Sequence, residues 1–214
     1  MGSYQMGPPA GLVLALQKRL DLAEFVETGT YRGDTADWAG RHFARVTTIE
    51  LSPAFHAAAT ARFQAQPRVR TLGGESVAML RAVVPALARP ALFWLDAHWS
   101  GLDTAGREAE CPVLGELAVI NASPHDHVVL VDDARLFCAP PPRPHRAEHW
   151  PDLASLLASL GAGGRRHVVL VEDVFAAVPA AERGFLTTFL QDQSARAAPR
   201  AAGRLARWKT KILP

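Results

Sequence analysis

In this 214-residue chain, the clearest indication of the fold is the stretch Val26-Glu27-Thr28-Gly29-Thr30-Tyr31-Arg32-Gly33-Asp34-Thr35. Apolar residues lead into a turn that holds two glycines, and a helical pattern follows over Thr35–Phe43. Because glycine has no Cβ, Gly29 lets the backbone turn sharply and approach a ligand closely. Gly33 permits a helix and a strand to pack tightly. The stretch therefore predicts a strand, a glycine turn and a helix.

The same alternation continues along the chain. Further strands are expected at Val46–Glu50, Val69–Leu72, Ala91–Leu95 and Val128–Val131, and further helices at Pro53–Gln64, Val77–Leu87, Leu114–Ile120, Trp150–Leu160 and Ala180–Leu190. His167–Glu172 and Val174–Val178 follow each other closely enough to form an antiparallel pair. Alternating strands and helices predict an α/β fold: a Rossmann-like, doubly wound, mostly parallel sheet with helices on both faces and an antiparallel closing strand.

The length fits one α/β domain. We expect a flexible N-terminus over residues 1–9, the domain over 10–192, and a basic C-terminal tail over 193–214. The tail carries six basic and no acidic residues, so the remainder, with 17 basic and 21 acidic residues, has a net charge of about −4. A solvated or loosely docked tail is the simplest interpretation, and contact with an acidic partner is the alternative.

Acidic residues recur where the expected strands end. Glu27, Glu50, Asp96, Asp132 and Asp133 all lie at or just after a strand end. Right-handed crossovers place the carboxyl ends of parallel strands along one edge of a sheet. Ligands bind at that edge in open α/β sheets. We therefore expect these distant carboxylates to converge on one rim.

The glycine turn indicates which ligand this rim would hold. A nicotinamide dinucleotide requires G-x-G-x-x-G and a helix N-terminus that faces its pyrophosphate. Here the two glycines are four residues apart, and Glu27 is expected to point a negative charge into the turn. A carboxylate at Glu50 can accept hydrogen bonds from ribose hydroxyls. Such a site suits a cationic nucleoside without phosphate, which is the character of S-adenosylmethionine.

The ordered set Glu27-x-Gly29-x-x-x-Gly33, Glu50, Gly74-Glu75-Ser76 and Asp96 resembles the class I S-adenosylmethionine-dependent methyltransferases over about residues 20–180. The resemblance implies that the first motif holds the methionine part, Glu50 the ribose, and Glu75 a position near the adenine. The alternative is a tight turn without a ligand and a Glu50 that only caps a helix. The implied cofactor-binding residues are Glu27, Thr28, Gly29, Thr30, Tyr31, Gly33, Thr35, Glu50, Leu51, Gly74, Glu75, Ser76 and Asp96.

Asp96, Asp132 and Asp133 form a second constellation. Three carboxylates at one edge repel each other and need protons or a cation to coexist. A divalent ion with oxygen ligands, such as Mg²⁺, meets this need. The arrangement is similar to the metal-dependent O-methyltransferases of the catechol and macrolide-sugar (macrocin) types, and the Asp-Asp pair matches the sugar branch better. The resemblance implies a metal that binds the acceptor hydroxyl and lowers its pKa. Helix capping, or contact with the cofactor alone, is the alternative.

Catalysis is assigned to His98 and Asp96. The catechol type has a lysine base where this chain has Trp99, so His98 is the nearest candidate for the base. A metal ligand and a structural residue are the other readings of His98. Trp99 would either stack on the acceptor or pack in the core, and Arg135 would either orient an anionic acceptor or pair with a carboxylate. Residues 138–148 predict a loop that could cover the rim.

Together these features predict a metal-assisted O-methyltransferase for a small-molecule or sugar hydroxyl, with S-adenosyl-L-methionine and a divalent cation as cofactors. A methyltransferase without metal, a non-catalytic binding module on the same fold and a nicotinamide-dependent oxidoreductase are the alternatives. No nucleic-acid partner is expected, because the body is mildly acidic. No membrane partner is expected, because no apolar run reaches the ~18 residues of a membrane span. Two cysteines fit reduced thiols in the cytoplasm. A homodimer is compatible with the sequence, which leaves the oligomeric state open.

Overall fold

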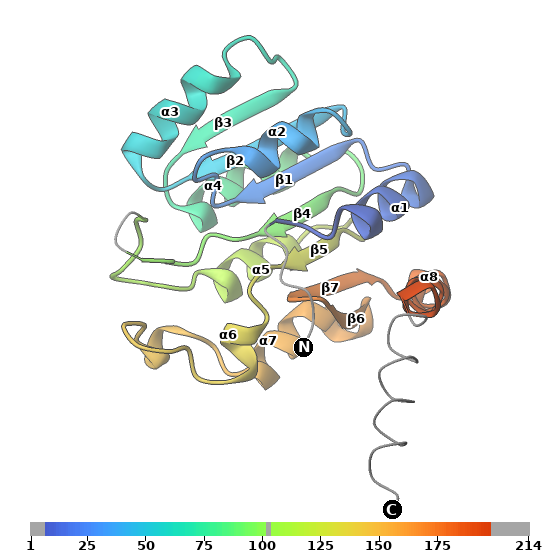
Figure 1. Cartoon of the computed structure of the whole chain (residues 1–214). Helices are drawn as coiled ribbons and strands as arrows, with labels where there is room; N and C mark the ends of the chain where they lie inside the picture. The colour runs from blue at the N-terminus through green and yellow to red at the C-terminus, as the bar shows by residue number, and fades with distance from the viewer. Residues whose placement is uncertain (1–6, 102–103, 198–214) are drawn as a thin grey trace, which may run out of the picture. The chain divides into compact units, whose positions relative to one another are not determined.

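The computed structural model describes residues 7–101 and 104–197, and within them seven strands form one sheet in the order β3-β2-β1-β4-β5-β7-β6 (Figure 1). The strands are β1 (Glu24–Thr28), β2 (Arg45–Glu50), β3 (Val69–Gly73), β4 (Leu92–Leu95), β5 (Val128–Val131), β6 (Arg166–Val171) and β7 (Val174–Pro179). β1 to β5 pair in parallel, whereas β7 is antiparallel to both β5 and β6. The predicted parallel sheet with an antiparallel closing pair is confirmed.

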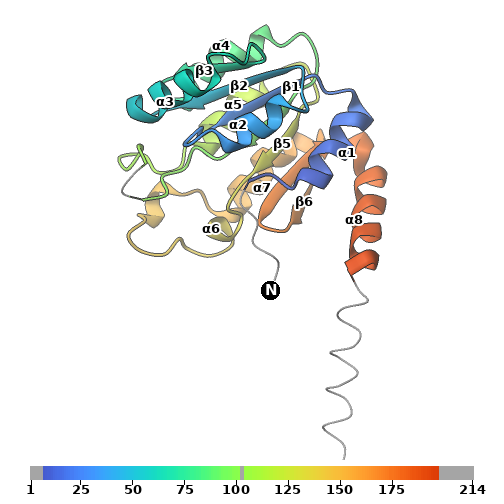
Figure 2. The ribbon, with the colours of Figure 1, turned by 45° about the horizontal axis from the view of Figure 1, so that its top comes forward.

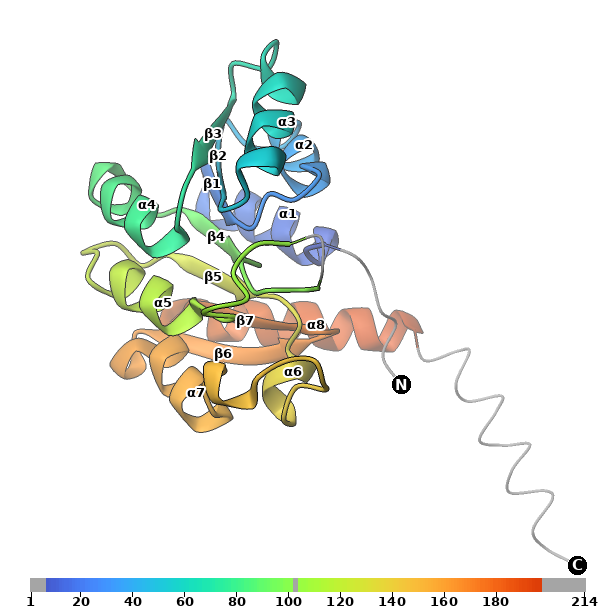
Figure 3. The ribbon, with the colours of Figure 1, turned by 90° about the vertical axis from the view of Figure 1, so that its left-hand side faces the viewer.

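Helices cover both faces of this sheet, as Figure 3 shows. One face carries α1 (Ala10–Leu20), α2 (Asp34–Gly40) and α3 (Pro53–Phe63), and the other carries α4 (Ser76–Val83), α5 (Val113–Asn121) and α7 (Leu153–Gly161). The chain builds β1, β2 and β3 outward and then returns past β1 to β4 and β5. Because the crossovers keep one hand, the reversal moves the connecting helices to the other face. The reversal lies between β1 and β4.

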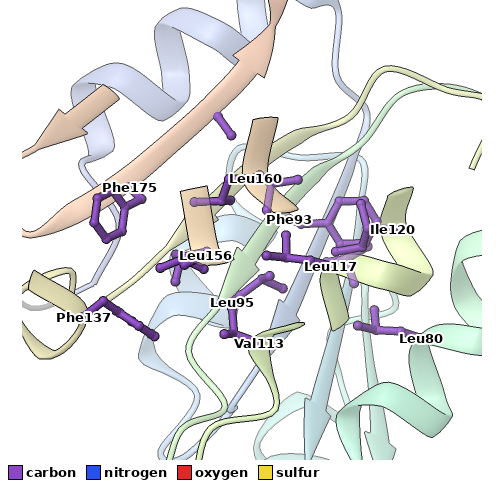
Figure 4. Close-up of a cluster of buried hydrophobic side chains, with 14 of the residues drawn as sticks. Leu80, Phe93, Leu95, Val113, Leu117, Ile120, Phe137, Leu156, Leu160 and Phe175 are labelled. Atoms are coloured by element: carbon purple, nitrogen blue, oxygen red, sulfur yellow. The ribbon is translucent and has the colours of Figure 1, made fainter. Parts of the chain in front are cut away.

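The core on the second face joins β4 to α5 and α7 (Figure 4). Phe93 and Leu95 of β4 are buried in one cluster with Leu117 of α5 and Leu156 of α7. The other β4 side chains, such as Trp94, are also buried, so this strand is covered on both sides. Complete burial is why the strand is apolar at every position and shows no alternation.

Several element boundaries differ from the predicted ones. The helix expected from Trp150 begins only at Leu153, because the side chain of Asp152 caps it by accepting a hydrogen bond from the Ser155 amide at 2.9 Å. The helix expected over Val77–Leu87 ends at Val83 and continues as a short 3-10 turn, η1 (Val84–Ala86), where Pro85 removes an amide donor. A further helix, α6 (Arg135–Cys138), is too short to produce a periodic pattern.

A boundary between two compact units falls between Pro179 and Ala180. The second unit contains a 3-10 turn, η4 (Ala180–Glu182), and the helix α8 (Arg183–Ala197), which extends past the predicted end at Leu190. The basic tail is helical over 193–197, and 198–214 lie outside the described residues, as do 1–6 of the expected flexible N-terminus. None of the helices in the described part of the chain is both long and apolar enough to span a membrane.

Candidate cofactor and acceptor pocket

The carboxyl ends of the parallel strands lie in register. Thr28 pairs with Leu95, and Leu95 pairs with Val131. The residues that follow continue the ladder: the amide of Asp96 donates to the carbonyl of Thr28 at 3.0 Å, and the amide of Asp132 donates to that of Leu95 at 3.1 Å. The register therefore places the first residue after each strand beside its neighbours, on the side to which the parallel strands point in Figures 1 and 2.

A cavity of about 740 Å³ lies over this edge, which is a typical size for a small-molecule site. Among the predicted residues it is lined by Gly29, Tyr31, Glu50, Leu51, Gly74, Glu75, Ser76, Asp96, His98, Asp132 and Asp133. Lining residues that the sequence did not suggest include Phe55, Glu108 and Asp173. The structure thus brings four of the five strand-end carboxylates to one pocket, and the fifth, Glu27, is buried and does not line it.

Glu50 is fixed by backbone donors at the end of β2. Its Oε2 accepts a hydrogen bond from the amide of Tyr31 and its Oε1 one from the amide of Ser52, both at 2.8 Å. An ionised carboxylate has about four acceptor positions, so two remain for a ligand. The side chain is only 7% exposed and yet lines the cavity. Tyr31 and Phe55 add two aromatic rings at the same end, with centroids 4.8 Å apart.

The two glycines of the first motif are required by the protein's own packing. Gly29 has φ +85°, and a Cβ there would lie 2.2 Å from the carbonyl oxygen of Asp96. The positive φ agrees with the sharp turn expected at Gly29, and the residue also lines the cavity, so the backbone after β4 is a second reason why a side chain is excluded at this position. Gly33 has φ +82°, and a Cβ would lie 2.9 Å from the ring of Phe63 in α3. Gly33 therefore permits close packing against the helix α3, whereas the sequence predicts close packing of a helix and a strand at this residue.

Glu27 does not point a charge into the turn, which corrects the prediction. Its carboxyl accepts a hydrogen bond from the hydroxyl of Thr48 at 2.5 Å, and that hydroxyl lies 2.5 Å from the hydroxyl of Thr30. Burial raises the pKa of Glu27 to about 8, although the bond from Thr48 opposes this. The carboxyl is therefore mostly protonated at pH 7. The predicted cofactor-binding residues that do not line the cavity are Glu27, Thr28, Thr30, Gly33 and Thr35.

His98 lies between carboxylates on the other side of the pocket. Its Nε2 is 2.7 Å from Oδ2 of Asp133, and its Nδ1 is 3.5 Å from Oδ1 of Asp96. Burial lowers the pKa of His98, but the hydrogen bond to Asp133 and the nearby carboxylates outweigh burial and raise it above the usual value. For Asp133, an acid, burial acts in the opposite direction and raises the pKa. The contacts of Asp133 with His98 and Arg135 outweigh burial and hold its pKa below the usual value.

The arrangement of these carboxylates does not fit the predicted divalent cation. Asp133 is bonded to His98 and paired with Arg135, and Oδ1 of Asp132 accepts a hydrogen bond from the Asp133 amide at 2.7 Å. Within the described residues, no group of three or more His, Cys, Asp or Glu side chains is arranged to hold a metal ion. The imidazole of His98 occupies the position between the carboxylates and, when protonated, supplies the positive charge that they require.

Arg135 and Trp99 are occupied by internal contacts. Arg135 pairs with Asp133 and with Asp173, and the Asp173 carboxylate also accepts from the Arg135 amide at 2.9 Å. The Arg135 guanidinium is thus held by carboxylates, as one of our two readings expected. Trp99 is buried, its ring lies 5.2 Å from that of His145, and it does not line the cavity, which favours core packing over stacking on an acceptor.

Asp173 could have been found from the sequence. β7 runs antiparallel to β5, with Phe175 opposite Val131. The turn between β6 and β7 therefore lies at the carboxyl edge of the parallel strands, where Asp132 and Asp133 are. The antiparallel pair is predicted from the sequence, and the register of that pair is what places its turn at this edge.

Comparison with known proteins bears on the fold. No protein-family model and no curated protein matches the chain. Among solved structures, an O-methyltransferase from Bacillus cereus in complex with SAH is similar at TM-score 0.56 and 17% identity, over 82% of this chain and 83% of that one. An O-methyltransferase from Streptomyces achromogenes involved in tomaymycin synthesis, in complex with SAM, gives TM-score 0.55 and 17% identity over 82% of each chain.

A third similar structure is a SAM-bound amino pentose methyltransferase from Micromonospora echinaspora, at TM-score 0.51 and 14% identity, over 79% of this chain and 89% of that one. The chain therefore has the fold of the class I S-adenosylmethionine-dependent methyltransferases, as the resemblance in the sequence implied. What the pocket binds, and which reaction it serves, follow from its own residues.

Proposed function

We propose that this chain is an S-adenosylmethionine-dependent methyltransferase that methylates a hydroxyl group of a small molecule or sugar. The observation that carries the proposal is the single pocket at the strand ends, which has Glu50 at one side and His98 with Asp133 at the other. One side offers acceptors to a ribose, and the other offers a group that can take a proton. The likeness to methyltransferases that bind SAM or SAH supports the same reading.

The residues of the pocket suit this cofactor. The free acceptor positions of Glu50 fit the ribose hydroxyls, and the neighbouring rings of Tyr31 and Phe55, tilted by 60° to each other, offer aromatic contacts for the adenine. Among the ionisable side chains of the lining, acidic ones such as Glu75 outnumber the basic ones, His98 and Arg135, which favours a cofactor that carries a positive sulfonium. A pyrophosphate would be repelled by the same charges. S-adenosylmethionine, when bound, supplies a methyl group whose bond to sulfur breaks with both electrons left on sulfur.

Proton removal is assigned to the pair of His98 and Asp133. Asp133 accepts the Nε2–H of His98 at 2.7 Å, which fixes the ring and its tautomer. The other nitrogen, Nδ1, faces Asp96 and is then available to take the proton of the acceptor hydroxyl. Nδ1 would take the proton that the acceptor hydroxyl gives up when it receives the methyl group. Because these carboxylates are already engaged with His98 and Arg135, the proposal routes no step through a metal ion.

Calorimetric titration tests the cofactor half of the proposal. We expect both S-adenosylmethionine and S-adenosylhomocysteine to bind the wild-type chain, and NADH to give no heat. A product assay with S-adenosylmethionine carrying a labelled methyl group, run over a panel of catechols and sugars, tests the chemical half. Equal turnover with Mg²⁺ and with a chelator is expected. Cofactor binding without turnover of any acceptor would favour a non-catalytic binding module. Activity that requires Mg²⁺ would show that a metal ion binds among these carboxylates in place of the His98 imidazole.

A further inference from the structure

One buried carboxylate fastens the Pro-rich segment 139–150 to the chain that follows β4. Glu110 is 1% exposed, and its Oε2 accepts a hydrogen bond from the indole Nε1 of Trp150 at 3.0 Å. Both of its oxygens lie 3.1 Å from the amide of Arg146, and Oε2 is 3.2 Å from Nδ1 of His145. Three donors from one irregular segment thus converge on a single side chain that lies far away in the sequence.

Glu110 is charged in this setting. Burial alone would raise its pKa, but the bonds from Trp150, Arg146 and His145 together hold the pKa below the usual value. Charge-assisted hydrogen bonds are about twice as strong as neutral ones. Segment 139–150 contains only a 3-10 turn, η2 (Ala147–His149), as regular structure. The bonds to Glu110 therefore supply order that secondary structure does not.

The last residue of this segment, Trp150, lies beside the proposed base, His98. The ring of Trp150 lies 5.5 Å from the imidazole of His98 and 5.2 Å from the ring of Phe137. Trp150 thus stands on one side of His98, and Asp133 holds its Nε2. If Trp150 moved, the imidazole would lose the ring that packs beside it while keeping its hydrogen bond.

We propose that Glu110 is a positioning residue, which holds Trp150 in place and thereby fixes the orientation of the His98 imidazole in the pocket. The importance of that orientation for catalysis rests on the proposed function. The arrangement itself does not, because it involves neither cofactor nor acceptor.

Nuclear magnetic resonance of the full chain at pH 7 tests the arrangement. In Glu110→Gln the side chain keeps its size, but an amide donor replaces one carboxylate oxygen and meets the donors of the segment. We expect the indole N–H signal of Trp150, assigned by its loss in Trp150→Leu, to move. The imidazole signals of His98, assigned by their loss in His98→Asn, should shift or broaden as well. Glu148→Gln removes the same charge from an exposed site in the same segment and should change neither.

Two results would overturn the proposal. An unmoved Trp150 signal in Glu110→Gln would show that Glu110 does not hold the indole, and unchanged His98 signals beside a shifted Trp150 would show that the segment is fastened without positioning the base. If Glu110→Gln does not fold, Glu110→Asp decides: the shorter carboxylate keeps the charge but is drawn back from the donors of the segment, so the Trp150 and His98 signals must move, and unmoved signals would overturn the proposal. Calorimetry with S-adenosylhomocysteine, expected to be unchanged in Glu110→Gln, separates a failure here from a failure of the cofactor assignment.

Discussion

Nε2 of His98 lies 2.7 Å from Oδ2 of Asp133, within the pocket formed by the strand ends. The two residues come from the segments after β4 and β5, which are neighbouring parallel strands. A carboxylate that accepts one N–H of an imidazole orients the ring and leaves its second nitrogen free for a proton. This pair is therefore the part of the pocket that we connect with chemistry, as distinct from cofactor binding.

Replacing either member of the pair should lower turnover and leave cofactor binding unchanged. We expect His98→Asn to reduce kcat by ~10²- to 10⁴-fold, the usual contribution of a positioned acid or base. Asp133→Asn should also lower kcat, because an amide in place of the carboxylate does not hold the His98 imidazole in the same tautomer. Calorimetry with S-adenosylhomocysteine provides the control. A His98→Asn enzyme with wild-type kcat would contradict the assignment of the base.

The pH dependence of turnover should follow His98. Its pKa lies above the usual value, because the bond to Asp133 and the neighbouring charges outweigh the effect of burial. A base must be unprotonated to act, so kcat/KM should rise with pH and reach half its limit above pH ~6.5, the unperturbed histidine value. Asp133→Asn should move this midpoint downward. A profile that is flat from pH 6 to 9 would argue that no group of this kind takes the proton.

Glu50 should matter for binding and little for the chemical step. In Glu50→Gln one oxygen becomes an amide donor that faces the backbone amides of Tyr31 and Ser52 or the ribose. Losing hydrogen bonds to a charged acceptor costs ~1.5–3 kcal/mol. The dissociation constant of S-adenosylhomocysteine should therefore rise about 10- to 150-fold by calorimetry. Glu148→Gln, at an exposed site, is the matched control, and equal affinity in both variants would remove Glu50 from the cofactor site.

Gly29 should be needed for folding as well as for binding. A Cβ at this position would lie 2.2 Å from the Asp96 carbonyl oxygen, at φ +85°. Backbone strain of ~1–3 kcal/mol and a similar cost for overpacking predict that Gly29→Ala loses roughly 2–6 kcal/mol of unfolding free energy. Gly163 also has a positive φ, +66°, but open space around it, so Gly163→Ala measures the strain alone. Equal losses in urea unfolding would show that the contact with Asp96 is relieved at little cost.

The buried carboxyl of Glu27 predicts how stability changes with pH. Its pKa rises from 4.5 to about 8 on folding, mainly through burial, so the folded state holds a proton that the unfolded state releases between these values. The corresponding stability is present below pH ~4.5 and is lost as the pH rises toward 8. Glu27→Gln removes this loss. Relative to the wild type, the unfolding free energy of Glu27→Gln should increase by up to ~1.4 kcal/mol for each pH unit between about pH 4.5 and 8. Parallel curves from pH 5 to 9 would contradict the assignment.

Much of the pocket could be predicted because it follows from strand order. A carboxylate such as Asp132 needs only a strand end and a parallel neighbour to be placed at the edge. Glu110 could not be found in this way, because its partners lie in a Pro-rich segment without a period. The charge of Glu27 could not be predicted for a different reason: the residue does lie at the end of β1, but its burial beside Thr48 decides its protonation, and burial depends on packing.

The metal was predicted from residue types that are indeed close together. Asp96, Asp132 and Asp133 do line one cavity, but His98 stands among them and Arg135 pairs with Asp133. A sequence shows how many carboxylates reach a site, whereas the partner that neutralises each of them depends on side-chain orientation. For the same reason the sequence could not separate the two roles of Arg135.

Every role assigned to the pocket residues requires that the strand-end pocket holds S-adenosylmethionine. A crystal structure of the chain grown with S-adenosylhomocysteine tests this directly. We predict the ribose hydroxyls within hydrogen-bonding distance of the Glu50 carboxylate, and the sulfur at the side of the pocket that faces Asp96 and His98. Density for the molecule elsewhere, or an empty pocket at millimolar S-adenosylhomocysteine, would contradict the account.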